Sequence, residues 1–163
     1  MASPSEVSQK EYRALAEFRY QIRCFLRFSE DAARAAGLEP HQHQLLLAVK
    51  GMPDGSGFSI GEVAERLQIQ HHSTVELVDR LVQRGYVQRR HDGADRRHVL
   101  VHVTAKGERV LRELAVHHEE ELRELGPVLV SSLRRLMNTL RRKAGAKPKP
   151  AAARPKARRT AAR

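Results

Sequence analysis

The chain has 163 residues, which is enough for one domain with its own core, and its single cysteine, Cys24, excludes an internal disulfide and a zinc site built from cysteines. It has no tryptophan and only 4% aromatic residues, so we expect no platform that stacks bases or carbohydrates. It has no stretch near the ~18 apolar residues that would span a bilayer and no apolar signal segment in residues 1–10, so we expect a cytoplasmic, nucleoid-associated protein. The net charge of +11 belongs to the C-terminal end, because residues 141–163 contain ten Lys or Arg and no acid, whereas the other 20 basic residues nearly balance the 19 acidic ones.

A long first helix is predicted from about Ser8 to Ala36, where Ser8 and Glu11 form a capping box and Gly37 ends the helix. One face has apolar or small residues at alternating spacings of three and four, which predicts a buried seam of Leu15, Phe18, Ile22, Phe25, Ser29, Ala32 and Ala36. A different face repeats at every fourth position, with Ala16, Tyr20, Cys24 and Phe28. A single small domain cannot cover a helix that is apolar on two sides, so we expect a partner chain.

Two shorter helices are predicted next. Pro40 opens the first of them, and residues 51–57 form a glycine-rich loop after it. A second capping box, made by Ser59 and Glu62, then starts a short helix that runs through Leu67.

A fourth helix and a hairpin complete the middle of the chain. The helix runs from about His71 to Arg84 and ends at Gly85. Residues 87–103 are predicted to form two strands around a turn at residues 92–95. Val99, Val101 and Val103 alternate with Leu100 and His102, so the second strand is apolar on both faces at its start.

The last third of the chain is predicted to form two helices and a tail. Thr104 caps a helix that runs to about Leu125, and Gly126-Pro127 is expected to break it. A sixth helix then presents an apolar stripe of Leu129, Leu133, Leu136, Met137 and Leu140. Residues 144–163 have no periodicity and no bulky apolar side chain, so we expect a disordered basic tail.

The order of these elements predicts a mainly α fold with a small β-hairpin wing. Residues from about 40 to 104 would form a winged helix-turn-helix domain. Residues from about 8 to 36 and from 105 to 143 would form a helical dimerisation module, which makes residues 1–143 one unit.

Residues 59–107 resemble the core of the MarR (multiple antibiotic resistance regulator) family. The shared segments are VAERL, LVDRL at the usual distance from it, RGYVQRR, DRR and the closing VTAKG. Together these segments are specific, although each alone is weak. The flanking helices also fit the family, so the resemblance extends from about Glu11 to Lys143.

The resemblance implies that the helix containing LVDRL enters the major groove of DNA and that the wing reaches the minor groove. The residues of this helix expected to bind DNA are Gln70, His71, His72, Ser73, Val75, Glu76 and Arg80. The residues expected to face the core are Leu77, Val78 and Leu81. Many members have Ser-Thr where this chain has His72-Ser73, and Thr-Arg where it has Val75-Glu76, so the operator sequence cannot be transferred.

The chemistry of the groove-facing side chains leaves alternatives open. His71 and His72 can read base edges or bind phosphates, and phosphate is the default because at least half of protein–DNA hydrogen bonds reach the backbone. Glu76 can accept a hydrogen bond from cytosine N4, or it can cap Ser73 and repel incorrect sites.

The wing tip carries Asp95, Arg96 and Arg97, which match the DRR motif of the family. The resemblance implies that Arg97 enters the minor groove and that Asp95 braces it. A narrow A·T-rich minor groove concentrates negative potential, which suits the permanent charge of arginine. The alternative is a solvated turn with a surface ion pair.

The nine histidines raise the question of a metal. His117 and Glu121 share one helix face at i and i+4, a spacing that can hold zinc. Such runs are more often solvated charged faces, so we expect no bound metal.

Two residues are candidates for an effector site. His118 falls on the stripe Leu111, Leu114, His118, Leu122 and Leu125, where a histidine is usually a satisfied core residue. In the family, a cleft for small molecules lies near this helix. Cys24 invites comparison with the peroxide-sensing branch of the family, whose reactive cysteine is also on the first helix. The reactive cysteine of that branch stands well before the second helix, whereas Cys24 is close to it, so packing at an interface is the favoured role of Cys24.

No glycine-rich phosphate loop after a strand, nucleophile elbow or paired-carboxylate motif is present, so we expect neither enzyme activity nor a cofactor. We expect a homodimeric regulator, a repressor that binds a pseudo-palindromic operator in double-stranded DNA and is released by a small-molecule effector. Two other interpretations stay open. One is an architectural, largely nonspecific DNA-binding protein driven by the tail, and the other is a ligand- or metal-binding protein whose helix-turn-helix makes protein contacts.

Overall fold

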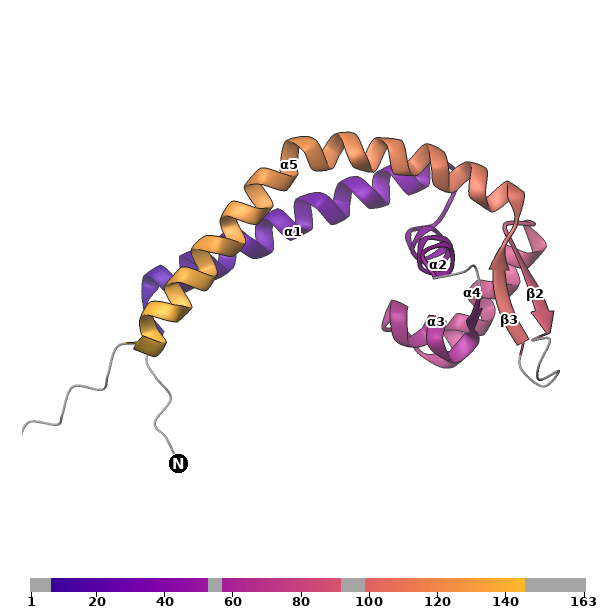
Figure 1. The fold of residues 1–163 in the computed structure, drawn as a ribbon, viewed down its shortest axis with the longest axis horizontal. Coiled ribbons are helices and arrows are strands. Elements are labelled where there is room, and N and C mark those ends of the chain that lie inside the picture. Colours follow the sequence, from indigo (N-terminus) through magenta and orange to yellow (C-terminus); the bar gives the residue numbers. More distant parts are fainter. Residues whose placement is uncertain (1–6, 53–56, 92–98, 146–163) are drawn as a thin grey trace, which may run out of the picture.

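A computed structural model describes residues 7–52, 57–91 and 99–145 of the chain. Two long helices, α1 (Gln9–Ala35) and α5 (Ala105–Gly145), lie side by side and form an arm. The other described residues form a lobe at one end of the arm (Figure 1). The fold is mainly helical with one small antiparallel sheet, as the order of predicted elements indicated.

The first helix begins and ends where the sequence predicted. The Ser8 Oγ accepts a hydrogen bond from the Glu11 N–H at 3.3 Å, and a Glu11 carboxylate oxygen accepts one from the Ser8 N–H at 2.7 Å. This reciprocal pair satisfies two N–H groups at the start of α1 that have no partner within the helix. Gly37 takes a φ of +76° just after the helix, a conformation that glycine adopts without strain.

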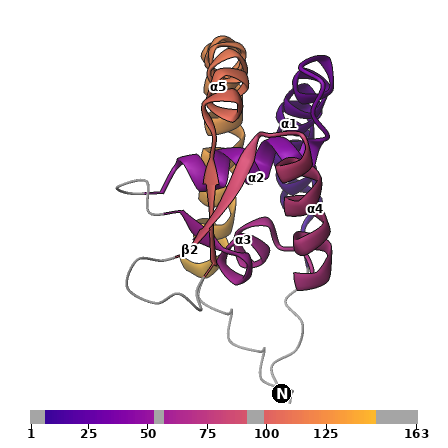
Figure 2. The ribbon, with the colours of Figure 1, turned by 90° about the vertical axis from the view of Figure 1, so that its right-hand side faces the viewer.

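The lobe contains three short helices, α2 (Pro40–Lys50), α3 (Ile60–Leu67) and α4 (His71–Gln83). Figures 1 and 2 show α2 running crosswise to the arm helices, with α3 and α4 packed beyond it. The capping box of Ser59 and Glu62 is present at the start of α3, and its hydrogen bonds lower the pKa of the Glu62 carboxyl.

The sheet has three strands rather than the two expected. Strands β2 (Val87–His91) and β3 (Val99–Val103) form the hairpin, with Val87 opposite Val103. The additional strand, β1 (Phe58–Ser59), pairs with the other edge of β3, which gives the order β1-β3-β2. A strand of two residues is too short for an alternating pattern, so the sequence did not predict it.

The core lies in the lobe and where the arm meets it. Apolar side chains from α2, α3, α4, the sheet and the first turns of α5 form one cluster. The largest fully buried apolar residues of this cluster are Leu38, Leu45, Leu46, Val63, Val78, Leu81, Val87, Val101 and Leu114.

The expected break at Gly126-Pro127 is wrong, because α5 is one helix of 41 residues with Pro127 inside it. Proline lacks the N–H that would bond to the carbonyl of residue 123, and its ring crowds that carbonyl. The loss affects one hydrogen bond of a long helix, and α5 bends along its length without ending (Figure 1). The two predicted C-terminal helices are therefore a single element.

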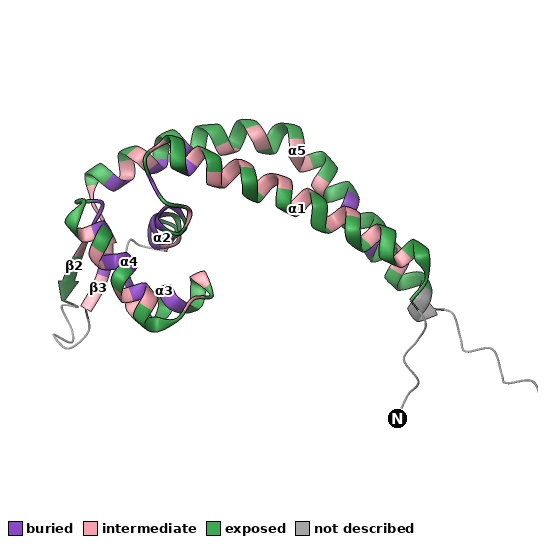
Figure 3. Ribbon diagram, turned by 180° about the vertical axis from the view of Figure 1, so that it is seen from behind, coloured by how far each residue is buried: buried purple, intermediate pink, exposed green. Residues whose placement is uncertain are grey.

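The arm is much less buried than the lobe, as Figure 3 shows by colour. The seam predicted on α1 is only half-buried in the single chain, and Leu15 is 46% exposed. The one buried residue of α1 is Ala33, beside the lobe. In the far half of α5, Ser132 and Leu136 are buried among the side chains that can be described.

Candidate nucleic-acid interface

Helix α4 divides into a buried face and an exposed face, as predicted. Leu77, Val78 and Leu81 are at most 4% exposed and belong to the core of the lobe. The predicted DNA-facing residues separate into two groups: Ser73 and Val75 are half-buried, whereas the exposed ones are Gln70, His71, His72, Glu76 and Arg80. The apolar face fixes the helix to the lobe and leaves the polar face accessible to a ligand.

The position at which α4 begins bears on the two interpretations of Glu76. The helix begins at His71 with Gln70 as its N-cap, so Ser73 lies inside the first turn and is not a cap. The interpretation in which Glu76 caps Ser73 is therefore wrong. The Gln70 side chain makes no capping hydrogen bond, and the Thr74 hydroxyl instead donates to the Gln70 carbonyl at 3.1 Å.

An ion pair joins α4 to the wing. Asp79 of α4 and Arg89 of β2 are 2.6 Å apart, and each side chain is at least a third exposed. An exposed pair of this kind contributes about 0–1 kcal/mol to stability, so it adds little to the packing of the wing against α4. The sequence did not predict this contact, because the two residues lie on different elements and only the tertiary fold brings them together.

Strand β2 adds exposed basic groups beside α4 that the sequence analysis did not select. Arg89, Arg90 and His91 are exposed. Arg89 and Arg90 close the RGYVQRR segment, which carried the family resemblance and no prediction of contacts, and His91 follows it. The predicted wing-tip residues Asp95, Arg96 and Arg97 lie outside the described residues, so their roles stay predictions.

A hollow of about 560 Å³ lies where the arm meets the lobe, next to His118. Its lining comes from α1, α2 and α5, with Phe25, His43, Leu47, Leu111, Ala115, His118, Glu119, Leu122 and Arg123. The volume is within the range of ligand pockets, ~300–1,000 Å³. His118, whose Nε2 is hydrogen-bonded to the Ser29 Oγ, forms part of the wall of this hollow.

Two histidines meet at this hollow. The ring centroids of His43 and His118 are 5.0 Å apart. Burial lowers the pKa of the His43 imidazole, and the nearby charge of a protonated His118 lowers it further. His43 is 5% exposed, so it is held in the neutral form at neutral pH.

Cys24 does not line this hollow, so the two predicted effector residues are not brought together. The thiol is half-buried and lies beside Tyr20, whose pKa is raised first by their side-chain hydrogen bond. This contact fits a packing role for Cys24 on the second face of α1.

His117 and Glu121 line a second hollow on the arm together with Asp31, Glu120 and Glu124. Within residues 7–52, 57–91 and 99–145, no group of three or more His, Cys, Asp or Glu side chains is arranged to hold a metal ion.

In the same ranges, no helix is both long and apolar enough to cross a membrane.

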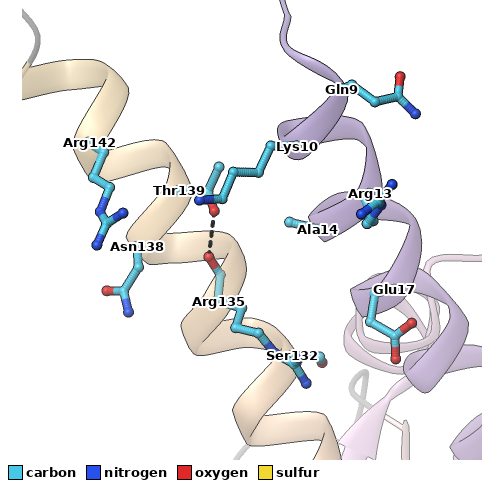
Figure 4. A pocket seen from close by; sticks show the side chains of 10 residues that line it. All are labelled: Gln9, Lys10, Arg13, Ala14, Glu17, Ser132, Arg135, Asn138, Thr139 and Arg142. Carbon is cyan, nitrogen blue, oxygen red and sulfur yellow. Dashed lines mark hydrogen bonds between the residues drawn. The ribbon is translucent and has the colours of Figure 1, made fainter.

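The far end of the arm contains a larger hollow, of about 710 Å³, between the start of α1 and the end of α5 (Figure 4). Four basic side chains line it, namely Lys10, Arg13, Arg135 and Arg142. The two arm helices therefore do not close against each other at this end.

Comparison with known proteins agrees with this architecture. The model of the MarR family matches residues 36–98, which contain α2, α3, α4 and the start of the hairpin. An uncharacterized HTH-type transcriptional regulator of Bacillus subtilis strain 168, YsmB, is 34% identical over 67 residues. That match covers 41% of this chain and 46% of the relative, so this chain matches about half of its length.

Solved structures share the fold at low identity. Sco3205 of Streptomyces coelicolor, a MarR family regulator in complex with DNA, has a TM-score of 0.66 at 20% identity, over 89% of this chain and 94% of that one. CouR of Rhodococcus jostii RHA1, bound to p-coumaroyl-CoA, has a TM-score of 0.59 at 23% identity, over 77% of this chain and 87% of that one. The match over residues 36–98, the related regulator and the shared fold make this chain similar to the MarR family, and its DNA-binding lobe is the part that the family model matches.

Proposed function

We propose that the protein is a transcription regulator that binds double-stranded DNA as a homodimer through α4 and the wing. The observation that carries this proposal is the division of α4, which buries Leu77, Val78 and Leu81 and exposes a polar face. The exposed basic residues of β2 stand next to that face, and the pair of Asp79 and Arg89 joins the two elements. The shared fold with Sco3205, which was solved in complex with DNA, supports the same reading.

The exposed residues of α4 would make two kinds of contact with DNA, one to phosphates and one to a base edge. The start of a helix attracts phosphate, because its first N–H groups point outward, and His71 and His72 stand there with Gln70. Glu76 lies one turn further along, is exposed and would accept a hydrogen bond from cytosine N4. Arg97 enters the minor groove, with Asp95 and Arg96 beside it, as the family resemblance implies.

A homodimer accounts for the exposed apolar surface of the arm. Apart from Val7 and Leu47, every large exposed apolar residue among those described lies on α1 or α5. On α1 they are Tyr12, Leu15, Tyr20 and Leu26, and on α5 they are Val116, Leu122, Val128, Val130, Leu133, Met137 and Leu140. Apolar patches of this extent mark interfaces, and a second copy would also enter the hollow at the end of the arm.

Repression relieved by a small molecule is the proposed mode of regulation. The hollow beside His118 has walls from both the arm and the lobe, with Phe25 of α1, His43 of α2 and Leu111 of α5. It suits an organic molecule with an apolar body and one polar group. A ligand that binds only one arrangement of arm and lobe would shift the population towards it and change the separation of the two α4 helices. The binding of p-coumaroyl-CoA by CouR supports a ligand in this fold.

The basic tail leaves a second candidate function. Seven Lys or Arg in residues 144–163, which follow three more at the end of α5, would favour binding to any DNA, as an architectural protein requires. One experiment is the selection of bound sequences from a random DNA pool by protein truncated after Lys143. The other is footprinting with the full chain, which keeps the tail. A discrete palindrome with half-sites about one helical turn apart supports the regulator, whereas uniform coating supports the architectural protein.

A further inference from the structure

The C-terminal end of α4, one turn beyond Arg80, carries an arginine with contacts to several elements. Arg84 is the C-cap of the helix. Its Nη2 donates to the Gly37 carbonyl at 2.7 Å, and its Nη1 donates to the Gln42 side-chain oxygen at 3.0 Å. A single guanidinium therefore contacts both sides of the turn that joins α1 to α2.

Both acceptors of Arg84 are fixed by their own surroundings. Gln42 is 3% exposed, and its side-chain oxygen also accepts the Glu39 N–H at 3.1 Å. Gly37 takes the left-handed conformation that ends α1, and its neighbour Leu38 is 1% exposed. Because neither acceptor can turn away, the two hydrogen bonds fix the orientation of the Arg84 guanidinium relative to the α1–α2 turn as well as its distance from that turn.

The same residue is also tied to the start of α5. The Lys106 Nζ donates to the Arg84 carbonyl at 2.8 Å. Both cations lie over the Tyr86 ring, with the Arg84 Cζ at 5.0 Å and the Lys106 Nζ at 4.7 Å from its centroid. Thr104, which precedes α5, donates its hydroxyl to the Gly85 carbonyl at 2.7 Å.

These contacts place one residue of the α4 segment against the end of one arm helix and the beginning of the other. Elsewhere α4 is held mainly by the apolar packing of Leu77, Val78 and Leu81, which resists separation more than it resists a small rotation. Hydrogen bonds to fixed acceptors are directional, so they can resist that rotation. Since α4 is about 20 Å long, a small rotation at Arg84 moves its DNA-facing end by several times more than its C-terminal end.

We propose that Arg84 is a positioning residue that sets the angle between α4 and the arm, and with it the separation of the two α4 helices in the dimer. The inference rests on the proposed function for its consequence on DNA, but the angle itself is a property of one chain. Any event that moves the α1–α2 turn, including occupation of the hollow beside His118, would reach α4 through this guanidinium.

The test measures a distance between α4 and the arm that changes with this angle. Spin labels are attached at His72→Cys on α4 and Glu124→Cys on the arm, in a Cys24→Ser background, and labelled protein is diluted into unlabelled protein so that only distances within one chain are read. Arg84→Met keeps the stem against Tyr86 and removes the donors. We expect it to broaden or shift the distribution of distances, while Arg109→Met, the loss of an exposed arginine on α5, leaves it unchanged.

A second variant covers the case in which Arg84→Met does not fold, as judged by circular dichroism. Arg84→Lys keeps the charge but loses the planar fork that serves two acceptors, so it should also broaden the distribution, by less. A distribution identical to that of the native chain in the folded variant overturns the proposal.

Binding to DNA gives the functional readout. Loss of about 1.4 kcal/mol of positioning corresponds to about tenfold weaker binding to the selected operator, whereas affinity for random DNA should be unchanged because it needs no fixed spacing. If the native chain binds no DNA, the proposed function fails, and the distance measurement still decides the role of Arg84. An equal loss of affinity for operator and random DNA would show that Arg84 is a phosphate contact and overturn the positioning role.

Discussion

His118 of α5 is hydrogen-bonded to Ser29 of α1 across the arm, with its Nε2 2.8 Å from the Ser29 Oγ. The other ring nitrogen, Nδ1, is 2.6 Å from the Leu114 carbonyl, which can only accept, so Nδ1 carries the proton. In the neutral ring, Nε2 then accepts from the Ser29 hydroxyl. The imidazole thus joins the two arm helices at the wall of the hollow that His43 also lines.

Replacing Ser29 with alanine removes this partner of His118. The Nε2 is left without its hydrogen bond in a half-buried position, and we expect the free energy of unfolding to fall by about 1 kcal/mol. Chemical denaturation measures the change. Ser131→Ala, at an exposed serine of α5, is the matched control, and equal stability of the two variants would show that the hydrogen bond contributes nothing.

Buried His43 makes stability depend on pH. Its folded pKa lies below its ordinary value of 6.5, so the unfolded chain binds the proton more tightly than the folded protein. The contribution of neutral His43 to the free energy of unfolding is complete above pH 6.5, and it is lost as the pH falls from there towards the folded pKa. We expect His43→Leu to weaken the loss of stability on acidification, whereas His41→Leu, at an exposed histidine of the same helix, keeps it. Parallel pH curves for the two variants would contradict the assignment.

Dimerisation should depend on the apolar stripe of α5. Light scattering at micromolar concentration is expected to give the mass of two chains. Leu133→Asp places a charge on the exposed stripe that also holds Met137 and Leu140, and should yield monomer. Ser131→Asp adds the same charge on the other side of the helix and should stay dimeric. A monomeric native chain would remove the basis for the dimer.

Arg97 is expected to carry the contact of the wing with the minor groove. Arg97→Ala should cost about 1–3 kcal/mol per half-site in operator binding and leave the circular dichroism spectrum unchanged. Arg109→Ala removes one exposed positive charge from α5 and serves as the control. Native affinity in a folded Arg97→Ala protein would show that the DRR motif does not act here as the family resemblance implies.

The basic tail should govern the salt dependence of binding. Truncation after Lys143 removes seven of the ten basic residues of the C-terminal end. Each phosphate neutralised contributes about −0.9 to the slope of log affinity against log salt, so engagement of half of these charges would make the slope about three units shallower on truncation. Titrations on operator and random DNA measure both slopes. Equal slopes for the full and truncated chains would make the tail inert, and a changed base preference would mean that it reads sequence.

The features that the sequence determined are those with short-range causes. Ser8 with Glu11 and Ser59 with Glu62 satisfy N–H groups three residues away, so the starts of α1 and α3 follow from the local sequence. Gly37 and Gly85 adopt positive φ just after helices, which needs no distant partner. The spacing of Leu77, Val78 and Leu81 likewise identified the buried face of α4, and the order of elements identified the fold.

The features that only the tertiary structure decided depend on residues far apart in the chain. Strand β1 exists because Phe58 meets Val101 on β3, and two residues carry no pattern of their own. The helix continues through Pro127 because the hydrogen bonds on either side outweigh the one that proline removes, a balance that a local rule for proline does not contain. Asp79 and Arg89 form a pair, and Ser29, His43 and His118 line one junction, only after the lobe has packed against the arm. Local hydrogen bonding and periodicity fix single elements, whereas side-chain contacts between elements follow from the whole packing arrangement.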